Sequence, residues 1–152
     1  MNPSESPCNM KPYRIVLDTN ILITGLRSRR GASFRVLSRI PTRSFTMLVS
    51  IPLFAEYEAV LRRPEQRRVH GLSDPSLDVL LAGWARVAEP VELHYLWRPQ
   101  LRDPADEMVL ETAMNGRADA LVTLNARDFR PAIQRFALSL WSPGELLQRL
   151  SS

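Results

Sequence analysis

Short runs of apolar, β-prone residues recur along the chain, and stretches with apolar residues at helical spacing separate them. The runs predict buried strands at residues 13–18, 45–49, 120–123 and 137–141. Val91, Leu93 and Tyr95 alternate with polar residues and predict a short edge strand. The stretches between the runs predict helices at residues 20–26, 31–40, 52–63, 74–88, 103–116 and from 142 onwards. Strands that alternate with helices indicate an α/β fold with a parallel sheet covered on both faces.

The chain length of 152 residues suits one domain with a genuine core. Residues 1–12 are polar and contain prolines, so we expect a flexible N-terminal tail before a single domain at 13–150. That tail lacks the apolar segment of a secretory signal, and no apolar run approaches the ~20 residues that span a bilayer. The lone cysteine, Cys8, excludes a disulfide framework, which fits a cytoplasmic protein.

The net charge is +4 with a sequence pI near 10.0, and almost every cation is an arginine. Arginine binds phosphate oxygens through two parallel hydrogen bonds, which favours a polyanionic partner. A solvated basic surface explains the same composition equally well. Charge alone therefore leaves both interpretations open.

A carboxylate follows the first predicted strand in the run Ile15-Val16-Leu17-Asp18-Thr19-Asn20. Open α/β sheets bind their ligands at the carboxyl ends of the strands. The loop after the strand at 120–123 places Thr123, Asn125 and Asp128 at the same edge of the sheet. These are also ordinary turn residues, so their type alone does not decide between a turn and a site.

Asp106 falls on the apolar stripe of the helix that begins near Pro104, together with Val109 and Leu110. A carboxylate that faces a core is costly unless it is paired or bound to a cation. Glu107 and Glu111 fall outside the stripe, and Glu107 can serve the helix dipole from a solvated position. We therefore favour a functional role for Asp106 and expect Asp103 to cap the helix.

Glu56 lies in the helix after the second strand and borders its apolar stripe, while Glu58 borders the opposite edge. Its place near the strand's carboxyl end slightly favours Glu56, and a solvated flank is the alternative. The two histidines, His70 and His94, lie far along the chain from these acids. Oxygen ligands without histidine or cysteine select Mg²⁺ or Mn²⁺ rather than zinc.

With these residues in place, the chain from Tyr13 to Leu150 resembles the PIN-domain family, and within it the VapC-like toxins of bacterial toxin–antitoxin systems. The resemblance rests on residues 16–20, the helix with Glu56, the segment 103–106, and the segments 118–125 and 128–129. It implies a three-layer α/β/α sandwich around a central, mainly parallel sheet of four to five strands. The family's four acids would fall on Asp18, Glu56, Asp106 and Asp128, which would be catalytic and metal-binding. Supporting polar positions would fall on Thr19, Asn20, Asp103, Thr123 and Asn125.

The resemblance further implies an endoribonuclease that hydrolyses RNA phosphodiester bonds with Mg²⁺ or Mn²⁺. Arginines in loops near the strand ends would hold the RNA backbone, with candidates at Arg27, Arg29, Arg30 and Arg127. A toxin of this kind would have a small cognate antitoxin protein. PIN-domain proteins commonly dimerise, so the resemblance also implies a homodimer. Many relatives carry an aspartate where Asn125 stands, so Asp128 is the expected fourth acid.

Two other functions compete with this interpretation. One is a catalytically inactive PIN-like module that binds RNA or a protein, and the filled set of acids argues against it. The other is an aspartate-based phosphatase built on Asp18, which needs a second aspartate where this chain has Asn20. The six glycines are scattered, so neither a phosphate-binding loop nor a dinucleotide fingerprint is present.

Overall fold

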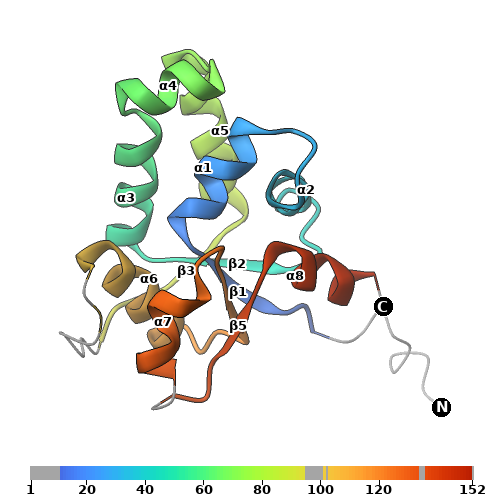
Figure 1. Cartoon of the computed structure of the whole chain (residues 1–152), viewed down its shortest axis with the longest axis vertical. Coiled ribbons are helices and arrows are strands. Elements are labelled where there is room, and N and C mark those ends of the chain that lie inside the picture. Colours follow the sequence, from blue (N-terminus) through green and yellow to red (C-terminus); the bar gives the residue numbers. More distant parts are fainter. Residues whose placement is uncertain (1–10, 95–100, 102, 134–135, 152) are drawn as a thin grey trace.

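A five-stranded sheet forms the centre of the computed structural model (Figure 1), which describes residues 11–94, 101, 103–133 and 136–151. Most of the predicted tail, including Cys8, lies outside the described residues. The strand order is β3-β2-β1-β4-β5, and every neighbouring pair is parallel. The strands are β1 (Arg14–Leu17), β2 (Thr46–Val49), β3 (Glu89–Pro90), β4 (Ala120–Val122) and β5 (Ser139–Trp141). The predicted α/β class with a parallel sheet is confirmed.

Helices cover both faces of the sheet, as Figure 1 shows with α6 and α7 on one side and α1 and α2 on the other. The described helices are α1 (Thr19–Arg27), α2 (Ala32–Arg39), α3 (Ile51–Leu61), α4 (Pro64–His70), α5 (Asp74–Val87), α6 (Pro104–Asn115), α7 (Ala126–Ile133) and α8 (Pro143–Leu150). Side chains of Ser50, Ser73, Asp103 and Ser142 accept backbone hydrogen bonds at four of the helix starts. Coverage of both faces explains why Ile15, Val16 and Leu17 of the central strand are all fully buried.

Three details of the sequence-based expectation are wrong. The edge strand lies at Glu89–Pro90 rather than at Val91 to Leu93, because its partner β2 ends at Val49, whose carbonyl accepts the Val91 N–H. Tyr95, the last residue of that expected strand, lies outside the described residues. Pro64 starts the additional helix α4, since a proline at the first helical position loses no hydrogen bond. No helix was predicted between the strands at 120–123 and 137–141, where the structure has α7 with Asp128 in its first turn.

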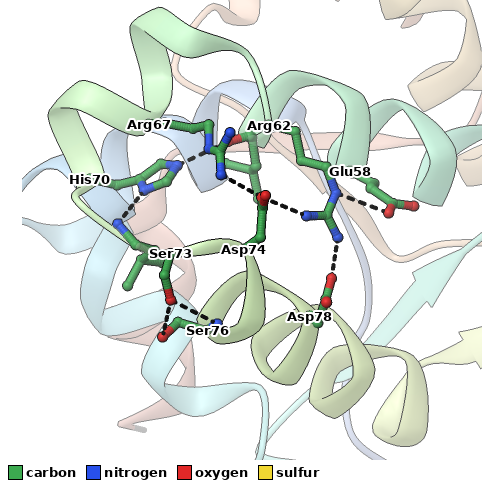
Figure 2. Close-up of polar contacts among 10 residues, drawn as sticks. Glu58, Arg62, Arg67, His70, Ser73, Asp74, Ser76 and Asp78 are labelled. Atoms are coloured by element: carbon green, nitrogen blue, oxygen red, sulfur yellow. Dashed lines mark hydrogen bonds and ion pairs between the residues drawn. The ribbon is translucent and has the colours of Figure 1, made fainter.

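A helical arm of α3, α4 and α5 is held together by ion pairs on its surface, which Figure 2 shows. Arg62 near the end of α3 contacts three carboxylates, those of Glu58, Asp74 and Asp78. Arg67 of α4 lies 2.5 Å from the same Asp74 carboxylate. Each exposed pair contributes little by itself, but the network joins the ends of three helices.

The order of the strands places a topological switch point between β1 and β4. From β1 the chain continues to β2 on one side of the sheet, and β4 pairs with β1 on the other side. Crevices for ligands form outside the carboxyl ends of such strands. None of the helices in the described residues is long and apolar enough to cross a bilayer.

Candidate functional site

Asp18 and Thr123 meet at the switch point, directly after β1 and β4. The Asp18 N–H donates to the Val122 carbonyl at 2.9 Å, and the Thr123 N–H donates to the Trp141 carbonyl at 3.0 Å, so the pairing of the strands fixes both residues. The Thr123 hydroxyl then donates to Asp18 Oδ2 at 2.7 Å. The sheet thus holds this carboxylate in one orientation.

The Asp18 carboxylate is buried, with 5% of the residue exposed. Burial raises the pKa of Asp18 above its ordinary value, and the negative charge of Asp128 adds to the effect. The Thr123 hydroxyl and the backbone amides of Thr19 and Asn20 oppose it by favouring the charged form. A buried carboxylate with a raised pKa gains stability when a cation binds it.

Asp106 lies half-buried in the first turn of α6, and neighbouring carboxylates influence its pKa as well. Burial, followed by the charge of Asp18, raises the pKa of Asp106 from 3.8 to about 7. Asp103, Asp128 and Glu107 add smaller contributions of the same sign. Three elements distant in sequence, β1, α6 and α7, therefore bring Asp18, Asp106 and Asp128 into one electrostatic cluster. Below, this group of three is called the acidic cluster.

Glu56 is not among the charges that raise the pKa of Asp18 or Asp106. Its side chain is 20% exposed and lies 4.0 Å from the guanidinium of Arg63. Three of the four predicted acids therefore lie within electrostatic range of one another, and the role of Glu56 stays a prediction.

The predicted supporting residues surround the acidic cluster in distinct ways. The Thr19 hydroxyl is buried and has no hydrogen-bond partner among the described residues. Asn20 Oδ1 accepts a long hydrogen bond of 3.4 Å from the Leu124 N–H, and the Asn125 N–H donates to the Thr123 hydroxyl at 2.9 Å. Asp103 caps α6 by accepting from the Ala105 N–H at 2.9 Å, so its expected capping role is confirmed.

The oxygen atoms available at this site are ligands of the kind that a hard divalent cation binds. Carboxylates that raise one another's pKa are relieved by a positive charge, and the buried Thr19 hydroxyl offers a further oxygen. Across the described ranges, however, no three acidic, histidine or cysteine side chains converge closely enough to form a complete metal-binding group. The acids of the cluster would have to move together around an ion.

Sequence reasoning gave no polar role to Tyr57 of α3, which has one in the structure. Its ring is fully buried, and its hydroxyl donates to the carbonyl of Leu17, the residue before Asp18. Burial and the charge of Asp18 raise the pKa of Tyr57 well above its ordinary value. A phenol among the apolar residues of this helix was the signal, because a buried hydroxyl needs a partner.

The expectation that Glu107 is solvated is wrong. Glu107 and Glu111 are 3% and 1% exposed, although neither lies on the apolar stripe of α6. The helix contacts α3 and α7 as well as the sheet, so it is enclosed on more than one side. Glu107 Oε1 accepts a hydrogen bond of 2.5 Å from the Leu101 N–H. Periodicity assumes one buried face and therefore cannot find such residues.

The four candidate RNA-binding arginines are all exposed, but they lie in two places. Arg127 is in the first turn of α7, next to Asp128. Arg27, Arg29 and Arg30 lie at the end of α1 that is opposite to Asp18. A helix of this length, Thr19–Arg27, separates its two ends by about 13 Å.

Residues 14–127 match the family model described as PIN domain. The match includes Asp18, Glu56 and Asp106 and ends one residue before Asp128. The assignment of Asp128 to the site therefore rests on the effect of its charge on Asp18 and Asp106. No curated protein matches the chain.

Proposed function

The chain belongs to the PIN-domain family, whose members are generally metal-dependent nucleases, and we propose that it is an endoribonuclease that hydrolyses RNA phosphodiester bonds. The observation that carries the proposal is the acidic cluster at the switch point. Burial and neighbouring charge raise the pKa of Asp18 and of Asp106, while Thr123 fixes the orientation of Asp18. A protein keeps such a costly arrangement where it serves a function.

In this proposal Asp18 and Asp106 would hold Mg²⁺ or Mn²⁺, and Asp128 with Glu56 would hold a second ion or orient the attacking water. A bound cation supplies a water of lowered pKa and neutralises charge on the phosphate. Asp106, with a pKa of about 7, would be held in its charged form at neutral pH by a bound cation. Thr123 and Tyr57 keep Asp18 in place, the first through its carboxylate and the second through the preceding carbonyl.

The biological role we propose is that of the toxin in a toxin–antitoxin pair. A cognate antitoxin would be a small protein that covers the acidic cluster, and the toxin would act as a homodimer. Growth arrest on expression, relieved by co-expression of the product of an adjacent short reading frame, supports this role. Expression of the active nuclease without any effect on growth contradicts it.

A second candidate is a PIN-like module that binds RNA or protein without cutting. Two observations favour it: the described residues hold no complete metal-binding group, and Glu56 lies beside Arg63 rather than in the acidic cluster. Such a module would bind RNA equally well with and without its acids. Cleavage assays therefore separate the two candidates.

The test compares the wild type with Asp18→Asn, Asp106→Asn and Glu65→Gln on a mixture of RNAs. Glu65 is an exposed acid in the first turn of α4, so its substitution is the matched control. We expect cleavage by the wild type and by Glu65→Gln with Mg²⁺ or Mn²⁺, and none with EDTA or in the other two variants. Equal cleavage by the wild type and Asp18→Asn would reveal a contaminating nuclease and overturn the proposal.

A further inference from the structure

A long segment of the chain contains arginines but no acid. Between Thr19 and Ala55 there is neither aspartate nor glutamate. The same segment contains the arginines at positions 27, 29, 30, 35, 39 and 43. Acids and bases are interspersed in the rest of the domain, so this segment concentrates the protein's excess positive charge.

None of these six arginines makes an ion pair or a side-chain hydrogen bond within the described part of the chain. The arginines in the rest of the domain are of two kinds, and those at positions 68, 86, 117, 127 and 130 also make no ion pair among the described residues. Arg14 pairs with Glu89 across the sheet edge, and Arg62 and Arg67 are engaged by carboxylates in the helical arm (Figure 2). The six arginines between Thr19 and Ala55 differ from both kinds because their own stretch of sequence contains no acid at all.

The fold gathers these arginines over two packed helices. Arg27 ends α1, Arg29 and Arg30 follow in the loop, and α2 carries Arg35 and Arg39 one turn apart. The helices approach closely at Gly25, where a Cβ atom would lie 2.5 Å from Leu37 Cδ1. The packing joins α1, the following loop and α2 into one unit that carries five of the arginines, and Arg43 follows four residues after α2. These six arginines together are called the arginine face below.

Helix dipoles explain only part of this arrangement. Arg27 and Arg39 lie in the last turns of their helices, where the helix dipole favours a cation. Arg29, Arg30 and Arg43 lie outside the helices, and Arg35 is in the middle of α2. Unpaired cations repel one another, so their accumulation favours a partner that supplies negative charge.

The surface chemistry favours nucleic acid over protein as that partner. Protein interfaces have an apolar centre, whereas nucleic-acid interfaces are polar and strongly positive. Among the described residues, the exposed large apolar side chains are Ile51, Val69, Val79 and Leu124, and none belongs to α1, α2 or the loop between them. Five of the six arginines are exposed and only Arg39 is half-buried.

We propose that the arginine face binds the phosphate backbone of the RNA substrate at a distance from the bond that is cut. The inference rests on the proposed nuclease function and extends it. The arginine face begins about 13 Å from Asp18, at the far end of α1. Binding there would anchor a strand whose other part reaches the acidic cluster, so substrates too short to span both places should be cut poorly.

The test measures binding of a labelled mixed-sequence single-stranded RNA in EDTA, where neither a metal nor cleavage is needed. One variant is Arg27→Gln/Arg30→Gln/Arg35→Gln. The matched control replaces three exposed arginines outside the face, which lie at positions 68, 86 and 117, with glutamine. Both variants remove three positive charges from a chain of net charge +4, so they differ only in where on the surface these charges are removed. Polyglutamate serves as the probe for an acidic protein, and thermal unfolding checks that each variant is folded.

We expect the face variant to lose about tenfold to a hundredfold in affinity near 0.1 M salt and to lower the salt slope by about 2. The control should stay close to the wild type. Equal losses in both variants would show that net charge alone binds RNA and would overturn the proposal. Wild-type affinity for polyglutamate as high as that for RNA would do the same.

The two proposals fail in different ways. If the nuclease proposal is wrong, Asp18→Asn and the wild type will not differ in cleavage, whatever the face variant binds. If the arginine face is not used, cleavage will still depend on Asp18 while the face variant and its control bind RNA equally.

Discussion

Asp106→Asn should stabilise the metal-free protein at alkaline pH. A carboxyl whose pKa is raised by folding costs the folded state free energy as soon as it ionises. The folded pKa of Asp106 is about 7 and its ordinary value is 3.8, so the cost is absent below about pH 4, grows as the pH rises, and is complete above pH 7. Asparagine carries no charge and avoids this cost at every pH.

The size of the effect follows from the pKa and from the exposure of the side chain. For a fully buried carboxyl, a pKa of about 7 instead of 3.8 corresponds to about 4 kcal/mol. Asp106 is only half-buried, so solvent screening reduces the expected gain to about 1–2 kcal/mol. Loss of a favourable helix-dipole interaction subtracts a few tenths of a kcal/mol. The gain corresponds to a rise in Tm of a few degrees for a domain of this size.

The assay is thermal and urea unfolding of the wild type, Asp106→Asn and the control Glu65→Gln in EDTA at several pH values. The gain of Asp106→Asn should be largest near pH 8 and should disappear towards pH 4. Mg²⁺ should then stabilise the wild type more than the variant. A variant less stable than the wild type at pH 8, or a gain that does not change with pH, would refute the reasoning.

Three further predictions concern the surroundings of the acidic cluster. Mg²⁺ added to the wild type at pH 7 in weak buffer should release protons, and a pH electrode should record no such release from Asp106→Asn, because the pKa of Asp106 is about 7. Tyr57→Phe should lower the free energy of unfolding in urea by about 1–3 kcal/mol, since the buried Leu17 carbonyl loses its donor; unchanged stability would mean that the hydrogen bond is unimportant. Thr123→Val should weaken Mn²⁺ binding, measured by titration, because Asp18 loses the donor that favours its charged form; unaltered affinity would count against this positioning role.

The sequence was sufficient to predict the elements whose environment is uniform. The runs around Ile15 and Leu121 are buried on both faces, so their composition alone indicates strands of a parallel sheet. Asp106 was selected because a carboxylate on an apolar stripe departs from the helical pattern, and its catalytic role stays a prediction. The structure leaves Asp106 half-buried, while Glu107 lies outside the stripe and is buried. The place of Asp18 followed from the general rule that strand ends carry the ligands of α/β sheets.

Other features depend on contacts that no local pattern contains. The burial of Glu107 arises because α6 is enclosed by helices as well as by the sheet. The hydrogen bond of Tyr57 joins residues 40 positions apart in the chain. The short edge strand is limited by the length of β2, its only neighbour in the described sheet. Each of these requires knowledge of which elements pack together.

The most direct test of the central claim is a Mn²⁺ titration, followed by electron paramagnetic resonance, of the wild type, Asp18→Asn, Asp106→Asn and the double variant. If both carboxylates hold one cation, each single variant should lose most of the affinity and the double variant should lose little more. Losses that add fully in the double variant, or single variants that bind Mn²⁺ as the wild type does, would show that the two acids do not share an ion.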